Sequence, residues 1–178
     1  MKKIMFSDKY CLTQAVLCGA KTMTRRVLRD NVPLGNWEET AKHLPYKVGE
    51  VVAIAQPYKE VYPNADFEMV GDDFMNESAG WTNKMFVRAN LLPHHIRITD
   101  VKVERLQDIS NEDILREGVW QFYDNKKLFY VSKNIGYAPD VAFLTAREAF
   151  WFLIDKVSGN GTWESNPFVV AYSFELVN

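Results

Sequence analysis

The sequence contains few of the residues that build disulfide scaffolds. Only two of its 178 residues are cysteines, Cys11 and Cys18. They lie in one helical pattern, where two turns would separate them by about 10 Å, which is too far for a disulfide. We therefore expect both to be buried, reduced thiols in a cytoplasmic protein.

Histidine is also scarce, which limits the metal sites that the chain can build. The three histidines are His43, His94 and His95. Neighbouring side chains of an extended segment point to opposite faces, so His94 and His95 do not suit one metal ion. We expect no metal and no cofactor.

Long apolar runs and an excess of one charge are missing as well. Residues 1–6 lack the apolar stretch of a signal peptide, and no run reaches the length of a membrane span, so we expect no membrane partner. The chain has 21 basic and 23 acidic residues, a net charge of −2. This balance argues against nonspecific coating of nucleic acid, so a polyanion would have to bind at a local basic patch.

The length fits a single domain at 1–178 with an insertion at about 57–80. The insertion is acidic, and Lys59 is its one basic residue. A charge run of this kind is most simply a solvated face.

Apolar periodicity predicts the elements of the domain. Short β-branched or alternating runs predict strands at 3–6, 50–56, 84–90, 96–106 and 168–176. Helical spacing predicts helices at about 8–18, 110–117 and 145–158, a loop at 30–45 and a hairpin at 119–131. The fourth strand changes phase near Thr99 and Asp100, which indicates a bulge. This content is typical of an α+β domain with a curved mixed sheet or small barrel.

The most unusual segment is Gly19–Arg26, which follows the first predicted helix. One lysine, two threonines and two arginines occur there within six residues, without an acid. In an ideal strand Thr22, Thr24 and Arg26 share one face, and Lys21, Met23 and Arg25 the other. Such donors can bind phosphate, although from these residues alone a solvated, basic edge strand is the simpler explanation.

Trp163 precedes the last predicted strand, close to Asn166 and Pro167. A tryptophan at this place is most often a lid on the core. It could instead be a surface on which a base stacks.

Several blocks, taken in order, resemble the ASCH domains of the PUA-like superfamily, especially the phage and prophage-associated branch. The blocks are Gly19-Ala20-Lys21-Thr22-Met23-Thr24-Arg25-Arg26, Tyr46-Lys47-Val48-Gly49-Glu50-Val51, Val101 to Ser110 followed by Glu117-Gly118, and Trp163-Glu164-Ser165-Asn166-Pro167. Together they cover most of the chain, apart from the acidic insertion and residues 119–140.

The resemblance implies a PUA-like β-barrel flanked by helices, with a cleft beside the basic segment that binds RNA or nucleotides. One branch of the family hydrolyses the amide of N4-acetylcytidine with a Lys and a Thr of this motif and a Glu on a neighbouring strand. Lys21 and Thr24 match the first two residues. By alignment Arg97 stands at the Glu position, and Glu104 is a weak substitute.

We therefore expect RNA, a nucleotide or a modified nucleoside to bind in a basic cleft. The expected contact residues are Lys21, Thr22, Thr24, Arg25, Arg26, Arg97 and Trp163. One alternative is an amidohydrolase, with Thr24 as nucleophile and Lys21 as base, and a carboxylate near Lys21 would favour it. Another is a noncatalytic protein-interaction module, which an exposed apolar patch on the insertion would favour.

Overall fold

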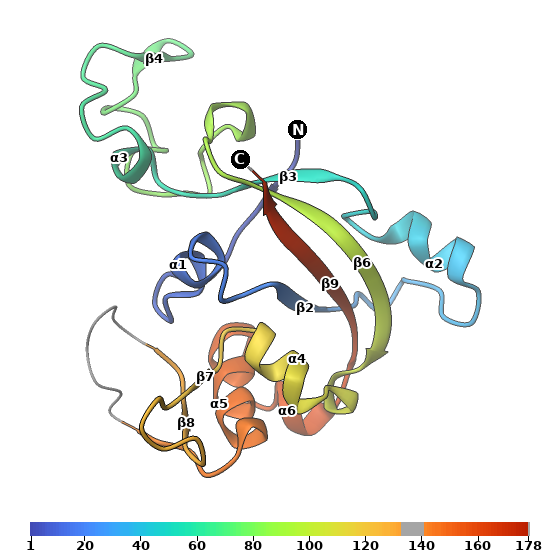
Figure 1. The fold of residues 1–178 in the computed structure, drawn as a ribbon. Coiled ribbons are helices and arrows are strands. Elements are labelled where there is room, and N and C mark those ends of the chain that lie inside the picture. Colours follow the sequence, from blue (N-terminus) through green and yellow to red (C-terminus); the bar gives the residue numbers. More distant parts are fainter. Residues whose placement is uncertain (133–140, 178) are drawn as a thin grey trace.

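The computed structural model describes residues 1–132 and 141–177, which form a mixed α+β fold around a five-stranded sheet (Figure 1). The strand order is β1-β3-β6-β9-β2. The strands are β1 (Lys3–Ile4), β2 (Met23–Val27), β3 (Val51–Ile54), β6 (His95–Arg105) and β9 (Phe168–Val177). β1 runs parallel to β3, and the other neighbours are antiparallel.

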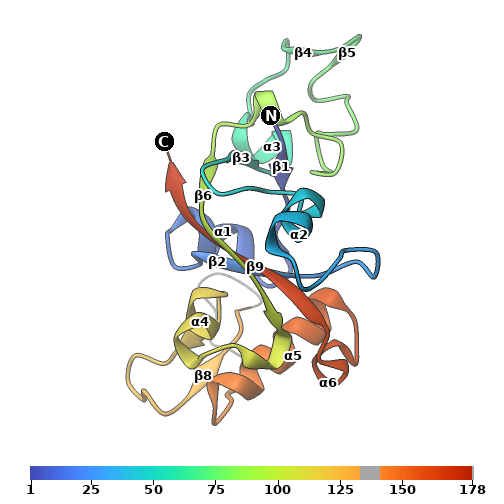
Figure 2. The same ribbon diagram turned by 90° about the vertical axis from the view of Figure 1, so that its right-hand side faces the viewer.

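β6 and β9 form the spine of the sheet, because they pair over almost their whole length, from His95 opposite Val177 to Arg105 opposite Phe168. The register shifts between Ile98 and Asp100, so the bulge predicted from the change of phase is confirmed. The paired strands curve together across the molecule (Figures 1 and 2).

The closed barrel that we expected is not formed within residues 1–132 and 141–177. β1 pairs with β3 at one end of the sheet and β2 pairs with β9 at the other, so β1 and β2 are its free edges. The predicted strand at 84–90 would have added to a barrel. Among the described residues that segment pairs with no strand, and it runs into a 3₁₀ turn, η1 (Ala89–Leu91). The ammonium of Lys3 donates to its backbone carbonyls at Lys84, Met85 and Val87 instead.

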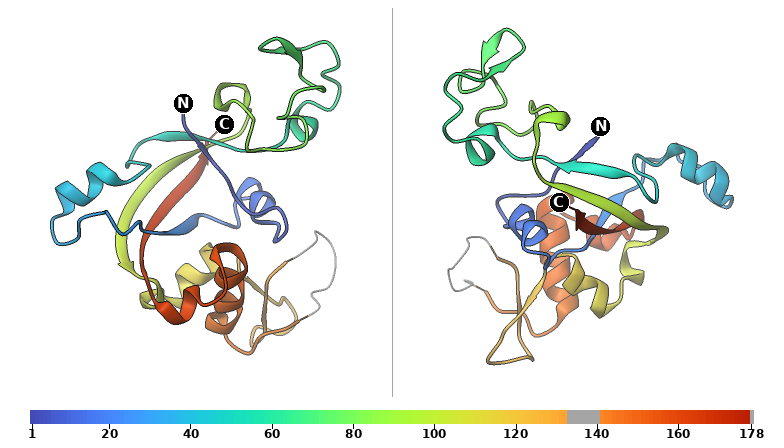
Figure 3. Two further views of the ribbon diagram at one scale, coloured as in Figure 1. Left: turned by 180° about the vertical axis from the view of Figure 1, so that it is seen from behind. Right: turned by 45° about the horizontal axis from the view of Figure 1, so that its top comes forward.

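Helices cover one side of the sheet and bury the main core (Figures 1 and 3). They are α1 (Leu12–Leu17), α4 (Asn111–Arg116), α5 (Ala146–Ser158) and α6 (Thr162–Ser165). α5, predicted at 145–158, begins at a capping box, in which Thr145 and Glu148 bond each other's backbone N–H groups. A 3₁₀ turn, η2 (Leu106–Asp108), links β6 to the loop that leads into α4.

The loop predicted at 30–45 contains a helix, α2 (Trp37–His43). Asn36 caps it by accepting from the backbone N–H groups of Glu38 and Glu39. The predicted hairpin is confirmed by β7 (Trp120–Gln121) paired with β8 (Phe129–Tyr130). Residues 133–140, part of the region outside the sequence resemblance, lie beyond the described residues.

The acidic insertion contains α3 (Tyr58–Val61), β4 (Met69–Val70) and β5 (Asp73–Phe74) and projects away from the main sheet (Figures 1 and 2). A second apolar cluster forms around the fully buried Tyr58. Three large apolar side chains of the insertion, Phe67, Met69 and Phe74, are exposed.

Both cysteines are free. Cys11 is half-buried and Cys18 is exposed, so the expected burial is wrong for Cys18. Within the described ranges, no helix is long and apolar enough to cross a membrane.

Candidate functional site

The basic segment is held in place by backbone bonds to three different elements. Gly19 has a φ of 77°, which lets the chain leave α1. The N–H of Lys21 donates to Ala15 of α1, and the N–H of Thr22 donates to Arg116 of α4. The carbonyl of Thr22 accepts from Phe174 of β9. Lys21 and Thr22 are therefore fixed in position before β2 begins.

The side chain of Lys21 is buried, with a relative exposure of 2% for the residue. Its ammonium donates to the backbone carbonyls of Met23 and Glu117, at 2.6 and 2.7 Å, and to the Glu117 carboxylate at 2.9 Å. Burial lowers the pKa of Lys21, and the neighbouring Glu117 carboxylate partly opposes this shift.

Arg25 is equally buried and is surrounded by carboxylates. Its guanidinium donates to Glu104 at 2.6 Å, to Asp113 at 2.9 Å and to Glu117 at 3.0 Å. Burial opposes the charged form of Arg25, but the three carboxylates outweigh it and raise its pKa. Burial alone would raise the pKa of Asp113, but hydrogen bonds from Arg25 and Lys102 hold it below the ordinary value.

Glu117 joins the two cations and was not among the predicted site residues. It follows the last residue of α4, and both of its carboxylate oxygens are used, one by Lys21 and one by Arg25. Gly118 comes next, with a φ of 102°; a Cβ there would lie 2.8 Å from a methyl group of Leu12. The available signal was the Glu117-Gly118 block, which the sequence analysis used only for the resemblance.

The hydroxyl of Thr24 is unpartnered among the described residues. The residue is 5% exposed, and its side chain makes no hydrogen bond to any residue in the described part of the chain. Thr24 lies opposite Tyr172 of β9, whose buried hydroxyl also has no partner there. Burial raises the pKa of Tyr172 to about 12, so this phenol stays protonated at neutral pH.

A small cavity of about 90 Å³ brings these groups together. We call it the β2 cleft and define it by Lys21, Thr24, Arg25, Arg26 and Glu117. Phe6 and the α5 residues Phe150 and Ile154 supply apolar walls. Arg26 lies less deeply than Lys21 and donates to the carbonyl of Met5.

Three predicted contact residues lie outside the β2 cleft, namely Thr22, Arg97 and Trp163. Thr22 does not line the β2 cleft, and its hydroxyl accepts from Arg116. Arg97 is half exposed and forms a surface ion pair with Glu175. The register of the sheet shows how far Arg97 is from Arg26. Arg97 pairs with Val51 and Glu175, whereas Arg26 pairs with Val170, which itself pairs with Val103 of β6. The expected grouping of Arg97 with the basic segment is therefore wrong, because six positions and a bulge of β6 separate them.

Trp163 is 9% exposed and lies in α6, where it makes an edge contact with Phe150. It is a lid on the core and not a wall of the β2 cleft. The basic segment contains no acid of its own, but carboxylates of β6, of α4 and of the residue after α4 pair with its two buried cations, Lys21 and Arg25.

No family model and no curated protein matches the sequence. Solved structures do resemble the fold. Protein EF3133 from Enterococcus faecalis V583, of family DUF984, is 16% identical and matches with a TM-score of 0.47 over 99% of this chain and 80% of its own. An ASCH domain from Lactobacillus crispatus JV V101 is 12% identical, with a TM-score of 0.43 over 96% and 75%. Membership of the ASCH family and of its phage-associated branch stays a prediction from the sequence motifs.

Proposed function

We propose that the β2 cleft hydrolyses the amide of an acylated nucleoside or nucleotide. The observation that carries this proposal is the Glu117 carboxylate, which bonds to Lys21 in the same cavity as the unpartnered hydroxyl of Thr24. A carboxylate beside Lys21 is the feature that distinguishes the hydrolase from a simple anion-binding site. In the resembling enzymes this Glu is on a neighbouring strand, whereas here it follows α4.

Thr24 is the nucleophile in this mechanism, and a neighbour has to take its proton. Moving the Lys21 proton to Glu117 within the buried pair leaves a neutral amine and a neutral acid. The amine accepts the Thr24 proton while the Thr24 oxygen forms an ester with the acyl carbon. Glu117 gives its proton to the departing nitrogen, so the ion pair is restored when the amide bond breaks.

The second half repeats the same transfers with water. The Lys21 proton again moves to Glu117, and the amine takes a proton from the attacking water. Glu117 then protonates the Thr24 oxygen as the ester breaks. The sum is amide plus water giving amine plus carboxylic acid, with Thr24, Lys21 and Glu117 unchanged.

The test is release of acetate from N4-acetylcytidine by the purified protein. Thr24→Val keeps the shape of the side chain and removes the hydroxyl, so we expect turnover to fall by at least ~100-fold. Thr22→Val is the matched control, because Thr22 lies outside the β2 cleft. Absence of acetate release by the wild type from both N4-acetylcytidine and its monophosphate, or equal turnover by Thr24→Val, would refute the hydrolase. Cytidine binding without turnover would leave the binding function expected from the sequence.

The exposed apolar residues of the insertion keep the protein-interaction module as a second candidate. Phe67 is 88% exposed and Met69 is 51% exposed. If this surface binds a protein, Phe67→Ser should weaken that complex and leave acetate release unchanged. Loss of acetate release in Phe67→Ser would contradict a separate role for the insertion.

A further inference from the structure

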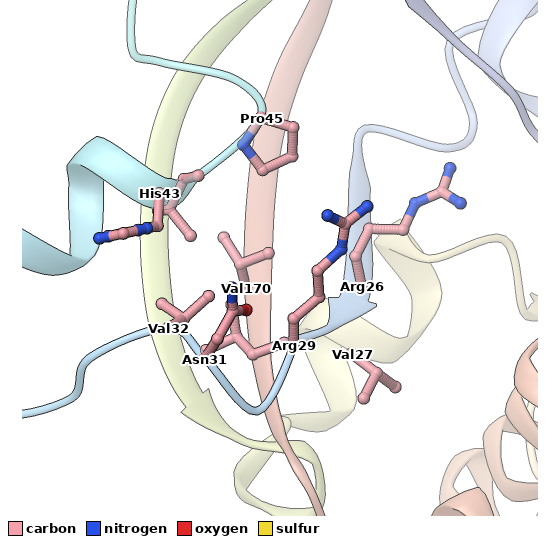
Figure 4. Close-up of a pocket in the computed structure, with 10 residues that line it drawn as sticks. Arg26, Val27, Arg29, Asn31, Val32, His43, Pro45 and Val170 are labelled. Atoms are coloured by element: carbon pink, nitrogen blue, oxygen red, sulfur yellow. The ribbon is translucent and has the colours of Figure 1, made fainter.

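A second cavity lies beyond the end of β2, next to the β2 cleft. Its volume is about 370 Å³, and it is bounded by β2, the loop after it, the end of α2 and β9 (Figure 4). We call it the arginine pocket and define it by Arg26, Arg29, Asn31 and His43. Figure 4 shows Arg26 and Arg29 on one side of the pocket and His43 on the other.

The charge of this pocket is not neutralised by the protein. No Asp or Glu lines it. Arg26 and Arg29 form no ion pair with any residue of the ranges 1–132 and 141–177. Lys21 and Arg25, by contrast, are both paired with carboxylates. The arginine pocket is therefore the place beside β2 where an anion meets uncompensated cations.

The sizes of the two cavities also point to a ligand that occupies both. At about 90 Å³ the β2 cleft is smaller than the ~300–1,000 Å³ of ordinary ligand pockets. The arginine pocket, at about 370 Å³, is within the range of cavities that hold small ligands. Arg26 lines both cavities, so the two adjoin at this side chain.

We propose that the arginine pocket binds the phosphate group of the ligand whose base lies in the β2 cleft. Arg29 offers a planar fork that matches phosphate oxygens, and Asn31 and His43 add N–H donors. The preferred ligand is then a phosphorylated nucleotide, free or within RNA, and not the bare nucleoside. The inference rests on the function proposed for the β2 cleft and specifies its substrate class.

The experiment compares the affinities of cytidine and cytidine monophosphate by calorimetric titration. For the wild type we expect cytidine monophosphate to bind at least ~10-fold more tightly, because a charge-assisted bond to phosphate contributes about that factor. Arg29→Ala should bring this ratio close to one. Arg88→Ala is the matched control, since Arg88 is exposed and forms no ion pair with any described residue, but does not line the pocket.

An RNA arm separates the two sources of phosphate. If a short oligocytidylate binds in an Arg29-dependent way and the mononucleotide does not, the ligand is a residue of RNA. Equal affinities for cytidine and for both phosphorylated ligands, or an Arg29→Ala protein that keeps the wild-type ratio, would overturn the inference. Arg29-dependent phosphate binding without acetate release would refute the hydrolase alone.

Discussion

The sharpest prediction concerns Glu117→Gln, which removes one negative charge between two buried cations. The residue exposures of Lys21, Arg25 and Glu117 are 2%, 4% and 5%, so water cannot replace the missing charge. Arg25 keeps Glu104 and Asp113, whereas Lys21 loses its one carboxylate within the described residues. Leaving a buried charge without its partner costs about 3–5 kcal/mol.

The glutamine oxygen still accepts from Lys21, so we expect the lower end, a loss of about 3 kcal/mol in the free energy of unfolding. For a chain of this length, this corresponds to a fall of about 6–12 °C in Tm. The assay is urea unfolding followed by tryptophan fluorescence. Glu175→Gln is the control, because it breaks the exposed pair with Arg97 and should cost about 0–1 kcal/mol.

A double variant tests the reason as well as the size of the effect. If the uncompensated ammonium causes the loss, adding Lys21→Met to Glu117→Gln should recover part of the stability. The reasoning is refuted if Glu117→Gln is no more destabilising than Glu175→Gln, or if the losses of Glu117→Gln and Lys21→Met simply add.

Two further predictions concern the surroundings of this network. Gly118→Ala should lower the free energy of unfolding in urea by about 2–4 kcal/mol, because it strains a left-handed backbone and places a Cβ against Leu12. At Gly49, which has a similar backbone, the added Cβ meets no neighbour, so Gly49→Ala should cost about 1–2 kcal/mol. Equal losses would rule out the contact between the Cβ and Leu12. Because the pKa of Asp113 is lowered in the folded protein, its carboxylate stabilises the fold at any pH above the ordinary pKa of 3.8. This contribution disappears as the pH falls through the folded-state pKa. The difference in the free energy of unfolding between wild type and Asp113→Asn should therefore shrink between pH ~5 and pH ~2, and a constant difference would contradict the assigned direction.

The sequence predicted those features of the fold that depend only on residues close together in the chain. The capping box at Thr145 and Glu148 needs four consecutive residues, and the bulge near Asp100 follows from a change of phase within one strand. The prediction of a loop at 30–45 is wrong at α2. It rested on the turn-forming residues Pro33 and Gly35, although Asn36 is the N-cap of a helix.

The site was predicted in part, for a similar reason. Lys21, Thr24 and Arg26 occur in one short motif, and β2 together with the residues just before it places all three along one cavity. Glu117 was missed because its pairing with Lys21 spans 96 residues, and no local pattern reports such a contact. Arg97 was placed wrongly because its position depends on the register between β6 and β9.

Lys21 joins parts of the chain that are distant in sequence, because its ammonium holds a carbonyl of β2 and a carbonyl after α4. Substitutions at Lys21 or Glu117 are therefore expected to destabilise the fold, in addition to any effect on the proposed chemistry. Thr24 is different, since no described side chain or backbone group depends on its hydroxyl. The chemistry proposed for the β2 cleft can therefore be removed by a substitution at Thr24 alone, without loss of a contact that holds the described fold together.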